Sequence, residues 1–470
     1  MMEVAALHVV PTLYKAIETC PFHFDQTLPE TAALDLRIEL LVCLNTLARR
    51  FGSDRGHLSR RPCTMHALFL GALLSISRPC TAITIPTDAG GAIPHTALTR
   101  SGGGAVAWRP VPTLRINLDL PPEQRYVAVA TRFNASIWNF YTTLFAHDPA
   151  LTNALYAMVD KRGPEPDGVM RGEIQGIVAT TRLPAKFVQG VQALYELQTL
   201  MVPIVNGSSR QDPLPRRYRA LERWPLRGPG CTGIVATNTA DGTVVHARNM
   251  DLAPVKLFAP LVYEGVFTRN GSVVFRAEMV AGYVSLLTGY RPGAYVVERN
   301  TRYPAHKGGN REMLDNLLDG VPLSGWTLRR MIESISTYDA ALATVESAHF
   351  VATEYVVMSG VRRGDIVARD PSKVAHLSTL GSAAYVIVTN FDYWWHDVRE
   401  YLDPTGGHVG LPRRVAAQRI LNASLNAGLA LTPGLMNATI SADGVLADTI
   451  FQAVADVETG FWAIAQPVLP

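Results

Sequence analysis

The chain has 470 residues, of which 48% are hydrophobic and 18% are charged, so it can build a large core and is not a wholly disordered chain. Its 43 basic and 40 acidic residues leave a formal charge of +3, which gives no reason to expect nucleic acid as a partner. No apolar run reaches the roughly 18 residues that suggest a membrane-spanning helix. Five cysteines exclude a disulfide-dense scaffold.

Residues 65–82 have the layout of a secretory signal peptide, although they lie inside the chain. Two arginines precede a short apolar stretch, and small residues follow it at a plausible cleavage position. We expect Met65 to be the true start and residues 1–64 to be an extension of the gene model. The alternative is a buried helix in a genuine N-terminal domain. If the signal peptide is removed, Cys231 is the one cysteine left.

Asn-x-Ser/Thr sequons agree with a secretory route, although each is a weak signal alone. The glycosylation candidates are Asn134, Asn206, Asn270, Asn422 and Asn437.

Two patterns follow one another before Cys231. After a leader rich in Gly, Thr and Pro at 83–108, apolar residues recur at three- and four-residue spacing over 126–145, 151–159 and 185–200, which predicts helices. Residues 201–230 hold six arginines and five prolines, which predicts an exposed, extended segment. That segment is either an ordinary surface loop or a linker open to chain cleavage.

From Cys231 onward the pattern is that of strands mixed with helices. Asp241 and Gly242 lie between two short β runs, which predicts a hairpin. Several such hairpins favour a mixed α and β region with antiparallel pairing. The predicted strands cover 233–237, 243–247, 272–279, 294–299, 354–358, 366–368 and 384–391, and the predicted helices cover 310–318, 328–335, 338–347 and 412–427.

Cys231 begins a strand directly after Gly230. If the bond between the two residues breaks, the freed α-amine, with an ordinary pKa of about 7.7–8, lies on the same residue as the thiol and can act as its general base. The hairpin returns Arg248 and Asp251 to the side of Cys231, where an acid can hold the amine and a cation favours the thiolate. Taken alone, Cys231 is more often a structural residue, and Arg248 with Asp251 could be a plain surface ion pair.

The sequence CTGIVATNTADGTVVHARNMD at 231–251 resembles the CTSIVA…HGRNMD signature of the acid ceramidase family, which includes the N-acylethanolamine acid amidases. The resemblance covers roughly 108–470, and INLDLPP, RNMD and TGYRPG lean towards ceramidase. Further segments similar to that family stand in one order along the chain: INLDLPP (116–122), GEIQGI (172–177), YEL (195–197), AGYVSLLTGYRPG (281–293), TNFDYW (389–394) and PRR (412–414).

This resemblance implies an α+β fold, the four-layer αββα sandwich of the N-terminal nucleophile hydrolases, with an added helical α-chain region. The precursor would cleave itself between Gly230 and Cys231. The products would be an α chain (83–230), which ends in the activation linker, and a catalytic β chain (231–470). They would associate without a covalent link, because the cysteines of the family's inter-chain disulfide are missing here.

The activity that the resemblance implies is hydrolysis of ceramide to sphingosine and a free fatty acid. It would take place at a membrane surface in a lysosome or another acidic compartment of the secretory pathway, or after secretion, with a lipid-transfer activator protein as a further partner. The alternatives are an amidase for N-acylethanolamines or soluble amides, and a non-catalytic lipid-binding relative. No metal and no organic cofactor is implied.

Carried onto this sequence, the resemblance makes Cys231 the nucleophile and places Arg248 and Asp251 beside it. Asn390 would donate its side-chain amide to the oxyanion of the tetrahedral intermediate. Arg413 would be a cation behind these groups or on the side of the substrate.

The chain departs from the family at several places: 201–230 looks like an insertion of about 30 residues, Leu411-Pro412-Arg413-Arg414 stands where the family has DDRR, and one acidic residue is missing. Where the family has an Asn-Glu-Arg run, this chain has Asn300, Thr301 and Arg302. Threonine cannot replace a carboxylate, so that role is lost or has moved to Glu298. Glu298, Asn300 and Arg302 are candidates for contact with the substrate or with the catalytic residues. His246 is more easily explained as a structural histidine than as a general base, because the amine already meets that need.

Overall fold

The structure is a computed structural model, and it describes residues 107–164, 166–197, 199, 214–223, 230–303, 308–395, 397, 400 and 412–469. The predictions for residues 1–64, the signal peptide at 65–82, most of the leader and Asn206 lie outside the described residues and stay predictions.

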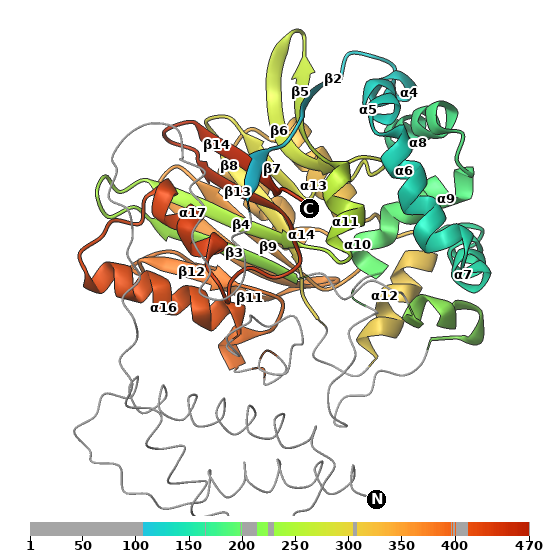
Figure 1. The fold of residues 1–470 in the computed structure, drawn as a ribbon. Helices are drawn as coiled ribbons and strands as arrows, with labels where there is room; N and C mark the ends of the chain where they lie inside the picture. Colours follow the sequence, from blue (N-terminus) through green and yellow to red (C-terminus); the bar gives the residue numbers. More distant parts are fainter. Residues whose placement is uncertain are drawn as a thin grey trace, which may run out of the picture. The chain divides into compact units, whose positions relative to one another are not determined.

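Two β-sheets lie at the centre of the described residues (Figure 1). The six-stranded sheet has the order β1 (Trp108–Pro110), β14 (Phe461–Pro467), β13 (Thr449–Asp456), β4 (Val244–Asp251), β3 (Gly230–Thr237) and β12 (Tyr385–Val388). The eight-stranded sheet has the order β11 (Lys373–Thr379), β10 (Arg363–Asp370), β9 (Glu354–Gly360), β8 (Tyr295–Thr301), β7 (Thr288–Arg291), β6 (Ser272–Val280), β5 (Val262–Arg269) and β2 (Thr113–Asn117).

Helices cover the outer faces of both sheets. On the six-stranded sheet, α17 (Pro433–Ser441) contacts β4 and β13, and α16 (Arg413–Asn426) contacts β12. On the eight-stranded sheet, α13 (Ser324–Ser334) contacts β6, and α14 (Tyr338–Ser347) contacts β9, β10 and β11. The inner faces meet where β3 and β4 pack on β8 and β9. These four layers confirm the predicted αββα sandwich.

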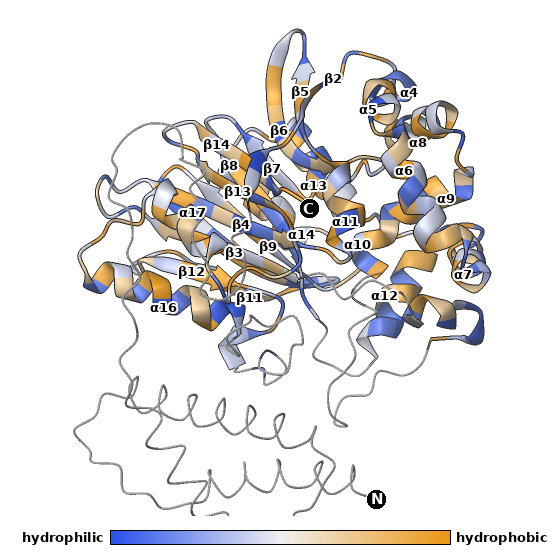
Figure 2. Ribbon diagram, viewed as in Figure 1, coloured by the Kyte–Doolittle hydropathy of each residue, from blue (hydrophilic) through white to orange (hydrophobic). Residues whose placement is uncertain are grey.

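The inner faces are apolar at one end and polar at the other. Val235, Val244, Tyr355, Val357 and Ile366 belong to one buried cluster between the sheets. Blue and orange alternate along several strands in Figure 2, as expected when neighbouring residues point to opposite faces of a sheet. Polar residues of β4 and β8 fill the space nearer Cys231, and these form the candidate site.

The upstream part of the chain forms a helical layer, as predicted. Its helices are α4 (Pro122–Arg125), α5 (Val127–Arg132), α6 (Asn134–Tyr141), η1 (Thr142–Ala146), α7 (Pro149–Val159), α8 (Gly168–Thr181), α9 (Ala185–Gly190), η2 (Val191–Ala193) and α10 (Leu194–Leu197). Aspartate caps fix two of the starts, because Asp148 accepts from the Leu151 amide of α7 and Asp167 accepts from the Met170 amide of α8.

The upstream part also adds an edge strand to each sheet, which the sequence did not predict. β1 pairs antiparallel with β14, with Trp108 opposite Pro467. β2 pairs parallel with β5, with Thr113 opposite Glu264. The expectation of antiparallel pairing is therefore wrong at the β2–β5 pair, while the described strands other than β1 and β2 do come from 230 onward.

The segment 201–230 also departs from its prediction in the part that is described. Residues Arg216–Arg223 form the 3-10 helix η4, which contacts α7. Leu214, Tyr218 and Leu221 are buried, so hydrophobic contacts hold this part in place, where an exposed, extended chain was expected. The rest of the segment, except Gly230, lies outside the described residues.

The remaining helices lie in the downstream part and agree in position with the predictions where these were made. They are α11 (Val255–Phe258), η5 (Ala259–Leu261), α12 (Gly309–Leu318), the α13, α14, α16 and α17 helices given above, and η6 (Tyr393–Trp395). In the described part of the chain, every helix is too short or too polar to cross a bilayer.

Candidate active site at Cys231

The β3–β4 hairpin sets the geometry of the site. Cys231 pairs with Met250, Gly233 with Arg248, and Gly230 with Asp251. Because residues alternate along a strand, Arg248 and Asp251 point to opposite faces of β4. Arg248 reaches towards the eight-stranded sheet, and Asp251 reaches towards α16.

The sulfur of Cys231 is fully buried among three groups. It lies 3.4 Å from the Tyr195 hydroxyl, 3.6 Å from Met250 Sδ and 3.8 Å from Arg248 Nη2. Burial raises the pKa of the Cys231 thiol, and the charge of Arg248 and the hydrogen bond with Tyr195 oppose part of that rise.

The backbone of Cys231 is held on its other side by Asn390 and Arg413. The Cys231 amide donates to Asn390 Oδ1 at 3.1 Å, and Arg413 Nη1 donates to the Cys231 carbonyl at 2.7 Å. Arg413 Nη2 donates to the same Asn390 oxygen at 2.6 Å. The nitrogen that would become the α-amine is thus already bound by a side-chain oxygen.

Asn390 differs in detail from its predicted role. Its Nδ2 donates to the Thr301 carbonyl at 2.8 Å, and its oxygen faces Cys231. In this uncleaved chain, Asn390 therefore holds the Cys231 nitrogen, whereas a donor to an oxyanion was expected. The two donors that reach its oxygen explain this orientation of the amide.

Asp251 lies beside Gly230, its partner in the β3–β4 hairpin, and so next to the bond between Gly230 and Cys231. Arg413 Nη1 donates to Asp251 Oδ2 at 3.0 Å, and Thr449 donates to its other oxygen. Burial raises the pKa of Asp251 to about 6, although Arg413 opposes the rise. A Cβ atom on Gly230 would lie 2.9 Å from Asp251 Oδ2, so this position has no room for a side chain.

Arg248 is not a surface ion pair. It is fully buried, and it donates to the Leu287 carbonyl at 2.6 Å, to the Arg299 carbonyl at 2.9 Å and to the Thr288 hydroxyl. Backbone and hydroxyl oxygens thus fix a cation close to the sulfur without neutralising it.

Glu298 lies beside the hairpin on the inner face of β8. Its Oε2 is 2.7 Å from His246 Nε2, and His246 Nδ1 is 3.1 Å from Ser359 Oγ. A Cβ atom on Gly233 would lie 2.4 Å from Glu298 Oε1 and 3.1 Å from Asn300 Nδ2. The side chains of Glu298 and Asn300 therefore occupy space that the glycine leaves. His246 has the structural position predicted for it, between two partners.

Arg302 does not reach the thiol. It donates to Asp392 at 2.6 and 2.8 Å and to Asp370 at 2.7 Å. Burial raises the pKa of Asp392, but the hydrogen bonds and charge of Arg302 outweigh it and leave the pKa below its ordinary value. Arg302 therefore secures the segment after β12 that carries Asn390, and a contact between Arg302 and the substrate stays a prediction.

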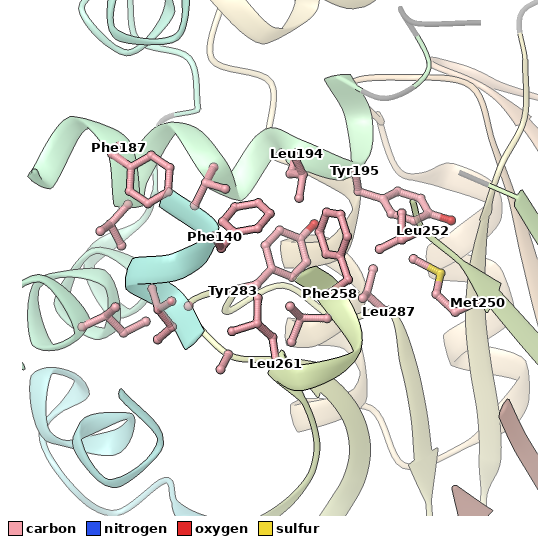
Figure 3. A pocket seen from close by; sticks show the side chains of 17 residues that line it. Phe140, Phe187, Leu194, Tyr195, Met250, Leu252, Phe258, Leu261, Tyr283 and Leu287 are labelled. Carbon is pink, nitrogen blue, oxygen red and sulfur yellow. The ribbon is translucent and has the colours of Figure 1, made fainter. Parts of the chain in front are cut away.

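Two of the side chains that contact the sulfur also line an apolar pocket. Tyr195 and Met250 lie at one end of it, and Phe187 lies at the other (Figure 3). Its cavity volume is about 40 Å³, room for only a few water molecules. The lining residues are Ile137, Phe140, Ile177, Phe187, Val188, Val191, Leu194, Tyr195, Met250, Leu252, Phe258, Leu261, Val280, Ala281, Gly282, Tyr283 and Leu287.

Sequence reasoning missed three residues of this site. Tyr195 contacts the thiol from 36 positions upstream, and the YEL segment was the one signal that could have pointed to it. Met250 lies in the RNMD segment but was given no role. Glu278 is fully buried without a hydrogen-bond partner in the described structure, and its sequence context gives no signal.

The described sequons differ in accessibility. Asn270 is exposed at the turn between β5 and β6, and Asn422 is exposed on α16. Asn134 and Asn437 are half-buried in helices. Asn270 and Asn422 are therefore the better placed of the four for a glycan, and glycosylation itself stays a prediction.

Comparisons with known proteins agree with the motifs. A family model described as the beta subunit of N-acylethanolamine-hydrolyzing acid amidase matches residues 109–168. In chain order this stretch lies in the part that we call the α chain.

Two relatives show how far the similarity extends. The N-acylethanolamine-hydrolyzing acid amidase of Caenorhabditis elegans is 28% identical over 47% of this chain, and the match spans 58% of the length of that relative. The acid ceramidase of Homo sapiens is 26% identical over 76% of this chain and 85% of its own length. A solved structure of the nematode amidase ortholog aligns over 51% of this chain and all of that one, with 26% identity and a TM-score of 0.43.

The αββα sandwich with a buried cysteine at the start of an inner strand defines the class of the N-terminal nucleophile hydrolases, which here act on linear amide bonds. Within that class, the chain is similar to the acid ceramidases and the N-acylethanolamine-hydrolyzing acid amidases.

Proposed function

We propose that this chain is a lipid amidase that hydrolyses ceramide to sphingosine and a free fatty acid, with Cys231 as its nucleophile after cleavage between Gly230 and Cys231. One observation carries the proposal. The sulfur contacts Tyr195 and Met250, two side chains that line an apolar pocket, while the nitrogen of the same residue is held by Asn390 Oδ1 at 3.1 Å.

Self-cleavage follows from the position of Gly230. The thiol attacks the Gly230 carbonyl, and the bond to the Cys231 nitrogen breaks as that nitrogen takes up a proton. Water then hydrolyses the thioester, which releases a carboxylate on Gly230 and a free thiol and amine on Cys231. Gly230 lacks a side chain that would collide with Asp251 and Arg413, so the attacked carbonyl stays accessible.

In the mature enzyme, the α-amine takes the thiol proton and the thiolate attacks the lipid amide. Acyl transfer to sulfur releases the amine product, and water then frees the fatty acid. Arg248 stabilises the thiolate, while Asn390, Asp251 and Arg413 hold the amine in place. Glu298 takes the place of the carboxylate that is missing at Thr301, because it faces Gly233 directly.

The pocket provides the place for an acyl chain. Its lining is apolar, and aromatic side chains from the upstream helices contribute one wall (Figure 3). Because its volume in this uncleaved chain is about 40 Å³, side chains must move before a fatty acyl chain enters. We expect cleavage and removal of the linker to permit that movement.

Ceramide is favoured over N-acylethanolamines by the segments INLDLPP, RNMD and TGYRPG and by the longer match to acid ceramidases. The family model and the higher identity to the nematode amidase favour the second candidate, an N-acylethanolamine amidase. Hydrolysis in an acidic compartment, and help from a lipid-transfer activator protein, belong to the ceramidase proposal.

Contact with a membrane is part of the same proposal. Val127 and Trp138 are 40% and 37% exposed on α5 and α6, next to helices that line the pocket. Such apolar side chains can enter the interface of a bilayer and bring the pocket to its lipid.

The test compares the purified chain with Cys231→Ala. The parent should separate into two chains on a denaturing gel and release fatty acid from ceramide faster than from an N-acylethanolamine. Cys231→Ala should stay a single chain and release none. A higher rate on the N-acylethanolamine would select the second candidate, and two chains from Cys231→Ala would contradict the mechanism.

A further inference from the structure

The thiol of Cys231 has a hydroxyl neighbour from the upstream part of the chain. Tyr195 lies on α10, before the bond proposed to be cleaved, and its hydroxyl is 3.4 Å from Cys231 Sγ. The tyrosine is 3% exposed. The other close neighbours of the sulfur are Met250, which has no proton to donate, and Arg248.

The hydroxyl of Tyr195 is held in place by Arg299. It donates to the Arg299 carbonyl at 2.9 Å, and the Arg299 guanidinium lies 4.3 Å from the centre of the Tyr195 ring. Arg299 in turn is buried between Glu196 and Glu354. Arg248 Nη2 donates to the same Arg299 carbonyl at 2.9 Å, so one oxygen positions both polar groups that approach the sulfur.

We propose that Tyr195 is the hydrogen-bond donor to the thiolate of Cys231, so that the upstream chain completes the nucleophile after cleavage. This inference rests on the proposed function. While the thiol is protonated, it can donate to the Tyr195 oxygen or to Met250 Sδ. In that state the Tyr195 hydroxyl donates to the Arg299 carbonyl.

The proposed change on ionisation moves no proton from the tyrosine. The S–H bond breaks, its proton forms a bond to the α-amine, and the sulfur keeps the electron pair. The hydroxyl of Tyr195 then turns its O–H from the Arg299 carbonyl to the sulfur, while Arg248 continues to donate to that carbonyl. Burial raises the pKa of Tyr195 well above its ordinary value, so the tyrosine donates a hydrogen bond and stays protonated.

Three other charged groups act on the thiol. The charge of Arg248 lowers the pKa of the thiol, and Asp251 and Glu298 raise it. None of these three groups hydrogen-bonds to the Tyr195 hydroxyl in the described structure, although Arg248 shares the Arg299 carbonyl with it.

The test uses Tyr195→Phe in the full chain, with Tyr283→Phe as the matched control. Both tyrosines are buried and line the same pocket, but the Tyr283 hydroxyl has no hydrogen-bond partner in the described structure. The measurement is the rate of iodoacetamide labelling of the Cys231 peptide against pH, followed by mass spectrometry. Tyr195→Phe should raise the apparent pKa of the thiol by about one to two pH units. Tyr283→Phe should leave it unchanged.

An unchanged pKa in Tyr195→Phe, or an equal shift in both variants, would overturn the inference. Labelling of the cleaved chain needs no substrate, so it reports on Tyr195 whether or not ceramide is hydrolysed. A fluorinated tyrosine at position 195, which is the stronger donor and keeps the packing, should shift the pKa downward. A fluorotyrosine chain with the parental pKa would also count against the inference.

Discussion

At the scale of single residues, Gly233 is as necessary to the candidate site as the side chains that take part in the proposed reaction. Its missing side chain leaves the space that Glu298 and Asn300 occupy, and Glu298 in turn bonds His246 at 2.7 Å. The sequence showed a glycine in a strand, which usually marks a weak point or a close approach. Only the fold shows which groups approach it.

We therefore expect Gly233→Ala to displace Glu298 and break its bond to His246. The free energy of unfolding should fall by about 1–3 kcal/mol, as overpacking of a core typically costs, and chain cleavage should slow. Urea unfolding and a time course on a denaturing gel measure the two effects. Gly168→Ala is the control, because a Cβ atom there meets nothing within 4 Å. Equal stability of the two variants would contradict the role of Gly233.

At the scale of elements, buried ion pairs join helices from the two sides of the proposed cleavage. Arg329 of α13 binds Glu173 of α8 through two hydrogen bonds of 3.0 Å, and both side chains are fully buried. Arg329 also donates to the Tyr126 hydroxyl at 2.7 Å. Together with the β1–β14 and β2–β5 pairs, these contacts hold the two parts together without a disulfide.

Glu173→Gln should take from Arg329 the buried carboxylate that binds it through two hydrogen bonds, and leave it the carboxylate of Glu333 at 2.7 Å. Removing one partner of a buried pair typically costs about 3–5 kcal/mol, which urea unfolding should detect. In the cleaved protein, the smaller chain should dissociate at lower urea concentration on size-exclusion chromatography. Glu458→Gln, which breaks the exposed pair with Arg362, should cost about 1 kcal/mol or less. Similar losses in both variants would show that the buried pair has no special role.

The sequence predicted the helices and strands whose hydrophobic residues recur at a regular spacing or whose ends are marked by turn residues. The Asp241–Gly242 turn gave the β3–β4 hairpin, and with it the positions of Arg248 and Asp251 near Cys231. β13 was missed because all eight of its residues are buried, so it has no alternation to detect. β2 was missed because its partner β5 lies about 150 residues away, and no local pattern records a parallel pairing at that distance. Tyr195 was missed for a similar reason, because it lies 36 residues from Cys231 and no local pattern records that contact.

At the scale of the whole molecule, buried carboxyl groups make the free energy of unfolding depend on pH. Glu278 lies opposite Thr288 in the eight-stranded sheet, and Thr288 lies opposite Glu298. Glu278 has no hydrogen-bond partner in the described structure. Burial raises its pKa to about 8, although Arg248 opposes the rise, and burial likewise raises the pKa of Asp251 to about 6. Both groups thus hold a proton in the folded state at pH values where the unfolded chain has lost it.

The direction of the pH dependence follows from that difference. Between the ordinary pKa of a glutamate, about 4.3, and the folded value of Glu278, about 8, folding takes up a proton, so the free energy of unfolding falls as pH rises. We expect the melting temperature to be higher at pH 5 than at pH 8. Glu278→Gln, whose amide resembles the protonated acid, should flatten this slope and be more stable than the parent at pH 8. The exposed substitution Glu123→Gln should keep the parental slope, and a Glu278→Gln chain with that same slope would show that the buried carboxyl is not its source.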